Sequence, residues 1–305
     1  MYTIKQVPED FYVKEIMDLD LKKSGTYTYF ILKKRDWNTF DALKEISKRL
    51  NVGIKRFGYG GNKDKKAVTE QYISVWNLDK NSLNKIKIKD IEIKFVGYGD
   101  KRISLGDLNC NYFKIVVRNL EKKKELKINK VKNYFDEQRF GVEKKNSMIG
   151  KALVKKNFKK VCELCGLNIK GKDYVGSINN IDKKMLKFYV HSFQSELWNK
   201  IVKKLKHSYS KIPLLGFLTE FENKEIKDLS KKVLKEERIS LKDFIIKQFL
   251  GLSMEGGMRD MFVKVDDFKY KYSKDNLNKG KFKVGLEFKL KSGSYATLIV
   301  KELSL

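Results

Sequence analysis

Alternating apolar and polar positions predict strands in the first third of the chain and again near its end. Val13 and Phe11 alternate with polar residues after Pro8, which favours an extended segment that follows a fixed turn. Runs rich in β-branched and aromatic residues predict further strands at 26–33, 71–76, 91–96 and within 102–118. The clean alternation of 282–290 continues through Gly293 into the apolar run 294–303. We therefore predict that these last two segments form a β-hairpin.

A helical period appears in two other regions. Leu43, Ile46 and Leu50 share one face of a predicted helix over 41–50, and Asn38 or Thr39 is a suitable N-cap. The middle of the chain has mainly helical patterns, with a second lysine-rich helical stretch near 225–250. One long amphipathic helix is predicted from apolar residues at a spacing of 3.6, namely Leu186, Val190, Phe193, Leu197, Ile201 and Leu205.

The net charge and the aromatic content indicate which kind of partner the protein binds. The chain has 305 residues, a formal net charge of +29 and 12% aromatic residues. Such an excess of cations predicts a polyanionic partner, and the aromatic content favours nucleic acid, whose bases stack and whose phosphates pair with cations. The sequence has no apolar run of transmembrane length and no signal peptide, and we expect a cytoplasmic protein without a membrane partner.

The cysteine content gives little support to a metal site. The chain has three cysteines, and Cys162 and Cys165 form its single CxxC. Zinc would need two further ligands, and the only histidines are His191 and His207. We therefore predict two helix-borne thiols packed against a core, and neither a metal nor a cofactor.

The most informative stretch runs from Arg56 to Gln71. It places three glycines within four positions, and then Asp64 alone among three lysines. The spacing fits neither a phosphate-binding P-loop nor a dinucleotide fold, and a solvated basic turn is the simplest interpretation. However, cations around one carboxylate hold it ionised and attract a polyanion to it. Asp64 could then act as a nucleophile or as a base on a bound nucleic acid, and the sequence does not choose between them.

The segment from Gly61 to Gln71 closely resembles the signature of the TruD family of tRNA pseudouridine synthases. Further segments resemble family motifs in the same order along the chain. These are Pro8–Phe11, the region around Asn111 and Phe113, Asn133–Gly141, Gly256–Arg259 and Phe288–Thr297. The chain departs from the family pattern at several positions, including Cys110 and Asp136, where the family has glycine.

The resemblance implies roles for particular residues. Asp64 would be the catalytic residue, and Lys5 would lie near it and anchor its carboxylate. Lys63 would support the same site. Phe113 would stack on the target base and Asn111 would hydrogen-bond in the same pocket, although a core aromatic is the simpler interpretation of Phe113. The residues that the resemblance suggests as RNA contacts are Lys65, Lys66, Arg139 and Arg259.

The resemblance also implies an architecture and a reaction. The fold would be α+β, a pseudouridine synthase fold with a mixed, mostly antiparallel sheet. A discontinuous catalytic domain would comprise 1–140 and 260–305, and a helix-rich inserted TRUD domain would comprise 141–259. The reaction would convert uridine to pseudouridine in tRNA, at position 13, without a nucleotide cofactor. The alternatives are a non-catalytic basic RNA-binding protein, which leaves Asp64 unexplained, and a membrane-surface protein.

Overall fold

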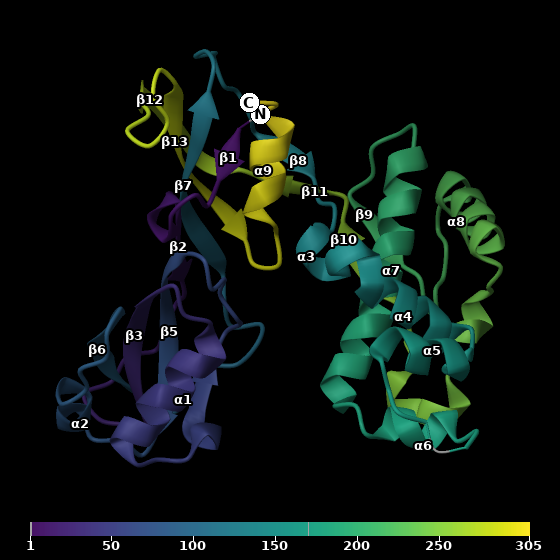
Figure 1. Ribbon diagram of the computed structural model, residues 1–305, viewed down its shortest axis with the longest axis horizontal. Coiled ribbons are helices and arrows are strands. Elements are labelled where there is room, and N and C mark those ends of the chain that lie inside the picture. The colour runs from purple at the N-terminus through teal and green to yellow at the C-terminus, as the bar shows by residue number, and fades with distance from the viewer. Residues whose placement is uncertain (1, 170) are drawn as a thin grey trace. The chain divides into compact units, whose positions relative to one another are not determined.

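The structure is a computed structural model that describes residues 2–169 and 171–305, and these form two compact units. The first unit comprises the chain up to residue 131 together with 263–305, and the second comprises 132–262. Figure 1 follows the chain through both units. The first boundary lies nine residues before the expected end at 140, and the second unit ends three residues after the expected end at 259. The assignment of the units as catalytic and TRUD domains stays a prediction.

The first unit is built on a nine-stranded mixed sheet. Its strands follow the order β12-β13-β7-β2-β5-β3-β6, with β1 paired to β7 and β4 paired to β5. Among the described residues, β2–β5 is its only parallel pairing, so the sheet is mixed and mostly antiparallel, as expected. The strands are β1 Thr3–Ile4, β2 Phe11–Ile16, β3 Tyr27–Arg35, β4 Phe57–Tyr59, β5 Val68–Trp76, β6 Ile91–Gly99, β7 Cys110–Leu120, β12 Asp266–Lys274 and β13 Phe282–Lys291.

Helix α1 (Thr39–Leu50) covers the β3–β5 end of this sheet. Asn38 caps the helix, because its side chain accepts a hydrogen bond from the backbone N–H of Asp41, and it is one of the two N-cap residues that the sequence left open. Leu43 and Ile46 are fully buried and pack into one cluster with apolar side chains of β3 and β5. A short helix, α2 (Lys80–Asn84), leads into β6.

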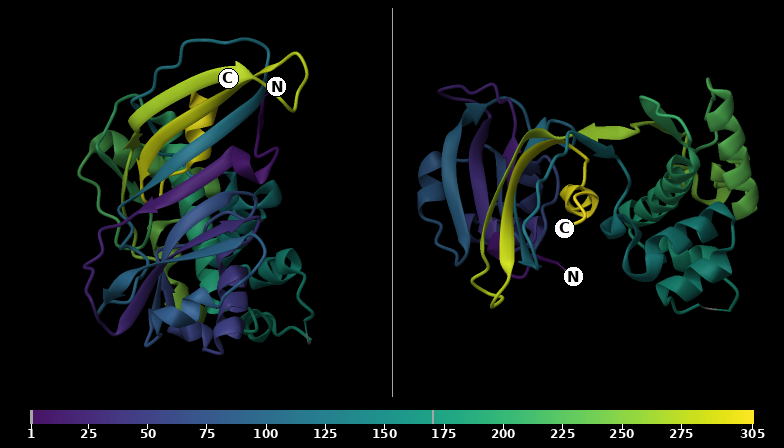
Figure 2. Two further views of the ribbon diagram at one scale, coloured as in Figure 1. Left: turned by 90° about the vertical axis from the view of Figure 1, so that its left-hand side faces the viewer. Right: turned by 90° about the horizontal axis from the view of Figure 1, so that it is seen from above.

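The predicted hairpin at the end of the chain is wrong in its second half. Residues Ala296–Glu302 form a helix, α9, and the strand that pairs with β13 on its outer side is β12. The β-branched residues favoured a strand, but Ala296, Ile299 and Val300 are buried at helical spacing. Packing against β7 and β13 therefore overrides the local β preference. Figure 2 shows α9 beside the strands.

Strand register places two polar residues, Glu15 and Asn111, in the middle of the same sheet. Asn111 of β7 lies opposite Glu15 of β2 on one side and Leu290 of β13 on the other. Phe113 lies opposite Val13 in the next row. Directly paired residues point to the same face of a sheet. The centre of the sheet thus carries Glu15 and Asn111 on the face that α9 covers farther along.

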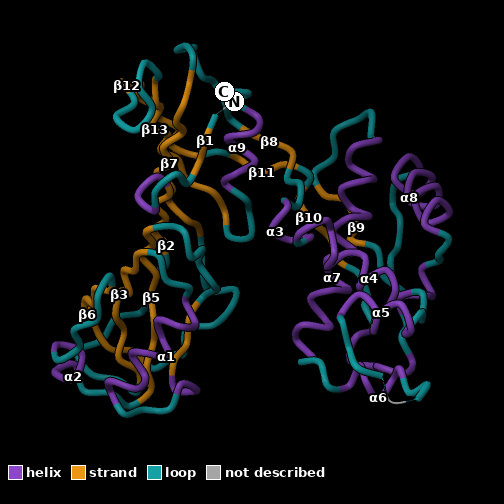
Figure 3. The backbone as a smooth tube through the Cα atoms, in the orientation of Figure 1, coloured by secondary structure: helices purple, strands orange, loops and turns teal. Residues whose placement is uncertain are grey.

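The second unit is mainly helical, as Figure 3 shows by its colouring. The expected long helix is α7 (Lys183–Lys204), the centre of this unit's apolar core. The second lysine-rich stretch is helical only to Glu237, and two 3-10 helices follow, Leu241–Phe244 and Lys247–Leu252. The other elements of this unit are α3 Glu137–Phe140, a 3-10 helix Val142–Lys144, α4 Lys145–Val154, α5 Phe158–Cys165, α6 Tyr174–Asn179, α8 Lys224–Glu237, β9 Lys211–Leu214 and β10 Gly257–Asp260. The division between the units falls within β8 Lys130–Lys132 and β11 Phe262–Lys264, which pair with each other.

Cys162 and Cys165 both lie on α5, and Cys162 is buried in the core, as predicted for structural thiols. The described residues contain no group of three or more histidine, cysteine, aspartate or glutamate side chains placed to hold a metal ion. None of the described helices is long and apolar enough to span a membrane.

Candidate active site

Asp64 lies in the loop between β4 and β5, and we call residues 60–67 the Asp64 loop. The loop begins with a glycine pair that lets the backbone turn away from the sheet. Gly61 has a φ of +149°, a conformation that residues with a Cβ atom rarely adopt. The glycines of this stretch therefore allow the backbone to turn, and their spacing does not match that of a phosphate-binding P-loop.

Hydrogen bonds from α1 and β5 hold the start of the loop. The backbone N–H of Lys63 donates to Thr39 Oγ1 at 3.0 Å, and this hydroxyl donates to Gln71 Oε1 at 2.8 Å. The amide of Gln71 also donates to the carbonyl oxygen of Gly61 at 3.2 Å. Thr39 and Gln71 are both 1% exposed, so these bonds lie out of water. The residues before Asp64 are thus fixed to two rigid elements.

Lys63 forms a buried ion pair beneath the loop. Its Nζ donates to Glu15 Oε1, and the side chains are 9% and 0% exposed. The other carboxylate oxygen of Glu15 accepts the backbone N–H of Tyr72 at 2.8 Å. Both oxygens of this buried carboxylate therefore have partners, as a charge away from water requires. Lys63 ties the Asp64 loop to β2 and does not face solvent as an RNA contact.

A second buried lysine reaches the loop from β3. Lys34 is fully buried, and its Nζ donates to the carbonyl oxygens of Asp64, at 2.9 Å, and of Trp37. Burial lowers the pKa of Lys34 to about 8, while the nearby charge of Asp64 acts in the opposite direction. Lys34 therefore positions the backbone of Asp64 itself.

The carboxylate of Asp64 is held by Lys5. Lys5 Nζ lies 2.5 Å from Oδ2 of Asp64, and the side chains are 17% and 34% exposed. The same ammonium group lies 4.0 Å from the centre of the Phe11 ring. A charge-assisted hydrogen bond of this kind fixes the direction of the carboxylate, and its partial exposure leaves it accessible to a substrate. The structure thus brings together Lys5 and Asp64, which the sequence predicted to be neighbours.

Asn111 and Phe113 lie in the first unit, as Lys5 and Asp64 do, but the two side chains have different surroundings. Asn111 is 9% exposed, and among the described residues its side-chain oxygen has no hydrogen-bond partner. Phe113 is 6% exposed, with its ring stacked on Phe288 at 5.5 Å and edge-on to Phe11. In this structure the ring of Phe113 is a core aromatic, and its stacking on a target base stays a prediction.

The four candidate RNA contacts fall into two pairs. Lys65 and Lys66 are exposed on the Asp64 loop. Arg139 and Arg259 belong to the second unit, where Arg259 donates to the carbonyl oxygen of Asn133 and lies 3.9 Å from the ring centre of Phe135. Arg139 lies over the same ring and donates to Ser195. Both arginines support the packing of the second unit, and their contact with RNA stays a prediction.

Sequence reasoning missed Glu15, Lys34, Thr39 and Gln71 as parts of this site. One signal was present for Lys34, which continues the inward alternation of Phe30 and Leu32 along β3. The preceding residue, Lys33, faces outward instead and pairs with Glu92. Successive side chains of a strand point to opposite faces of the sheet, so this alternation distinguishes the buried Lys34 from its more exposed neighbour Lys33.

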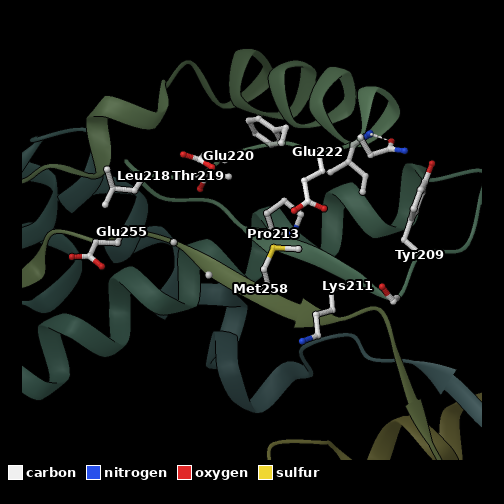
Figure 4. A pocket seen from close by; sticks show the side chains of 15 residues that line it. Tyr209, Lys211, Pro213, Leu218, Thr219, Glu220, Glu222, Glu255 and Met258 are labelled. Atoms are coloured by element: carbon white, nitrogen blue, oxygen red, sulfur yellow. Dashed lines mark hydrogen bonds between the residues drawn. The ribbon is translucent and has the colours of Figure 1, made fainter.

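The second unit also contains a pocket of about 700 Å³, shown in Figure 4. Three acidic residues line it, together with apolar side chains that include Pro213 and Met258. None of the candidate residues named from the sequence is part of its lining. The pocket is therefore distinct from the residues gathered around Asp64.

Comparisons with known proteins found relatives along almost the whole chain. The family model for tRNA pseudouridine synthase D (TruD) matches residues 2–169 and 204–303. The tRNA pseudouridine synthase D of Aquifex aeolicus is 33% identical, and the match covers 98% of this chain and 97% of that protein. A protein of Methanosarcina acetivorans assigned as a tRNA pseudouridine synthase D is 29% identical over 98% of this chain and 91% of its own.

The fold is similar to a solved structure as well. The crystal structure of a Methanosarcina mazei protein assigned as tRNA pseudouridine synthase D has a TM-score of 0.77 and 28% sequence identity. The similarity covers 98% of this chain and 92% of that one. Because the alignment with the Aquifex relative spans 383 positions, that relative carries segments which this chain of 305 residues lacks. On these matches the chain belongs to the tRNA pseudouridine synthase D (TruD) family.

Proposed function

We propose that this protein converts uridine to pseudouridine in tRNA, at position 13, and that Asp64 is the residue that acts on the target nucleotide. The Lys5–Asp64 pair is the observation that supports this most directly. It places a partly exposed carboxylate, fixed in direction, in a loop whose other exposed side chains include two lysines. Family membership supports the reaction, and the geometry around Asp64 supports this carboxylate as the group that acts.

The reaction is an isomerisation, and its atoms balance without a co-reactant. The N-glycosidic bond between N1 of uracil and the ribose breaks, the base rotates, and a C–C bond forms between C5 and the ribose. The hydrogen at C5 is released and N1 gains a proton. A carboxylate serves as a nucleophile or as a base in such a sequence. Lys5 and Lys34 would hold Asp64 in position during both steps.

The other candidate residues have supporting roles in this proposal. Asn111, with a buried side-chain oxygen that lacks a partner among the described residues, would hydrogen-bond the target base. Phe113 would contribute stacking if its ring becomes accessible beside Phe11. The first unit would be the catalytic domain and the second unit the inserted TRUD domain, and the enzyme would work in the cytoplasm.

RNA would be bound chiefly through charge. The net charge of +29 supports binding to a polyanion, and Lys65 and Lys66 would be phosphate contacts beside the catalytic residue. Arg139 and Arg259 would contact tRNA from the second unit. Because a uridine in folded tRNA is stacked, it has to flip out of the stack before Asp64 can reach it.

Tritium release separates an enzyme from a binding protein. Unmodified tRNA labelled with tritium at C5 of uridine would be incubated with the wild type and with Asp64→Asn, and tRNA affinity would be measured for both. We expect the wild type to release tritium and Asp64→Asn to release none while it binds tRNA as tightly. Tight tRNA binding without tritium release by the wild type would instead support a non-catalytic RNA-binding protein.

A further inference from the structure

The most exposed large apolar side chain of the first unit lies beside the Asp64 loop. Among its described residues, Leu105 is 81% exposed and Phe40 follows at 51%. A Cβ atom on Gly61 would lie 3.9 Å from Leu105 Cδ2, so Leu105 borders the loop directly. Phe40 follows Thr39, whose hydroxyl accepts the N–H of Lys63. The loop that carries the catalytic candidate is thus bordered by one strongly exposed leucine, and a second exposed apolar residue follows the helix residue that holds the loop.

The turn that carries Leu105 is anchored at both ends. Ile103 and Leu108 flank it, are 3% and 7% exposed, and belong to one buried cluster. The backbone N–H of Ile103 also donates to Ser74 Oγ at 2.9 Å. Single exposed leucines are common on protein surfaces and need no explanation alone. Leu105 differs because a fixed turn holds it out beside the candidate active site.

Its position suits a step that the proposed reaction requires. Three Cα–Cα steps separate Gly61 from Asp64, so these Cα atoms are at most about 11 Å apart. A base that flips out leaves a gap in the stack, and proteins that unstack nucleic acid often insert an apolar side chain there. A lysine would have to lose its hydration to enter such a gap.

We propose that Leu105 is a wedge that enters the RNA stack in the place of the flipped target uridine. This inference rests on the proposed function, because it requires a flipped uridine. Lys65 and Lys66 would hold the phosphates on the same loop, and Leu105 would occupy the vacated space. Leu105 then stabilises the flipped state and contributes little to the initial binding of tRNA.

The test compares rates within the bound complex. Single-turnover formation of pseudouridine and the Kd for tRNA would be measured for the wild type, Leu105→Ala, Leu105→Met and Leu21→Ala. Leu21 is a matched control, a half-exposed leucine of the same unit that lies against Gly97 on β6. We expect Leu105→Ala to slow the bound step by about tenfold or more, with Kd changed by less than about threefold. Leu105→Met and Leu21→Ala should stay close to the wild type.

A second substrate identifies the cause of the loss. In a tRNA that lacks the base 3′ to the target uridine, unstacking the uridine costs less free energy. The single-turnover rate of Leu105→Ala should therefore be closer to the wild-type rate on this substrate. A wild-type rate for Leu105→Ala, or an equal deficit on both substrates, would overturn the wedge. Failure of the proposed function is distinguishable, because the wild type itself would then form no pseudouridine on either substrate.

Discussion

Lys5 and Asp64 are 59 residues apart in the chain, and Lys5 Nζ lies 2.5 Å from Oδ2 of Asp64. This contact joins the N-terminal segment to the loop before β5. The backbone of Asp64 is held separately by Lys34, whose Nζ donates to its carbonyl oxygen. One lysine therefore directs the carboxylate and another fixes the backbone, and their loss should have different consequences.

Removing the Lys5 ammonium group should impair the reaction more than RNA binding. We expect Lys5→Met to lower the single-turnover rate by about tenfold or more, because the Asp64 carboxylate loses the partner that directs it. The Kd for tRNA should change little, since Lys5 is one cation among many. Lys65→Met is the matched control on the exposed part of the loop, and it should weaken binding without slowing the bound step. Equal bound-state rates for wild type and Lys5→Met would contradict this role.

Breaking the Glu15–Lys63 pair should destabilise the fold. In Glu15→Gln the buried Lys63 charge loses its counter-charge, which typically costs about 3–5 kcal/mol of unfolding free energy. Urea unfolding measures this loss. The double variant Glu15→Gln/Lys63→Met should recover much of the stability, because no unpaired charge remains. Glu92→Gln, in an exposed pair with Lys33, should cost less than about 1 kcal/mol. Similar losses for Glu15→Gln and Glu92→Gln would refute the buried-pair account.

Asn111 should be more important for the reaction than for the fold. Its side-chain oxygen is buried without a partner among the described residues, and such an atom contributes an unfavourable desolvation term. We expect Asn111→Ala to change the unfolding free energy by less than about 1 kcal/mol while lowering the turnover rate about tenfold or more. A variant that unfolds readily but retains its turnover rate would show that Asn111 is a structural residue.

Lys34 should make stability depend on pH in a defined window. Burial lowers its pKa to about 8 in the folded protein, whereas an unfolded lysine titrates near about 10.4. Between these values the unfolded chain holds a proton that the folded protein has lost, so this group's contribution to the unfolding free energy rises with pH. The contribution is unfavourable at neutral pH and disappears only above the upper value, where the lysine is neutral in the unfolded chain as well.

The comparison with Lys34→Met isolates this group from the other lysines. The stability difference, wild type minus Lys34→Met, should increase from pH 7.5 to pH 9.5 by on the order of 1 kcal/mol per unit within the window. Urea unfolding at both pH values measures it. A difference that is constant or that decreases with pH would show that Lys34 is not buried as a charged group.

The affinity for tRNA should fall steeply with salt. If about six to ten phosphates are contacted, about 10³–10⁵ in affinity is lost between about 50 and 200 mM salt. Replacing Lys65 and Lys66 together by methionine should reduce the slope of log K against log salt by about 2, since each phosphate contact contributes close to one. A wild-type affinity for tRNA that does not change with salt concentration would contradict binding through charge.

Local periodicity predicted the elements whose burial follows one clear face. The helix α1, the strands β2, β3, β5, β6 and β7, and the long helix α7 are examples. It failed at α9, because Ile299 and Val300 favour strands locally and only the packing of that segment on β7 and β13 selects a helix. The sequence therefore predicts whether a segment is a helix or a strand where local propensity and tertiary packing favour the same structure.

The candidate site was predictable only in part, and for a different reason. Asp64 and Lys5 came from motifs, but the partners beneath the loop did not. Glu15 meets Lys63 because β2 and β5 are adjacent parallel strands, and strand order is not encoded in local patterns. The exposed Leu105 had no sequence signal either, since a leucine in a turn is indistinguishable from a core residue until its burial is known.

The formation of pseudouridine in tRNA should depend on the carboxylate of Asp64. The most direct measurement is carbodiimide-dependent reverse-transcription stops on unmodified tRNA treated with the wild type or with Asp64→Ala. We predict a stop at one uridine with the wild type that is absent with Asp64→Ala, although both proteins bind the tRNA. The same stop with both proteins would contradict the role of Asp64, and no stop with either would contradict the proposed activity.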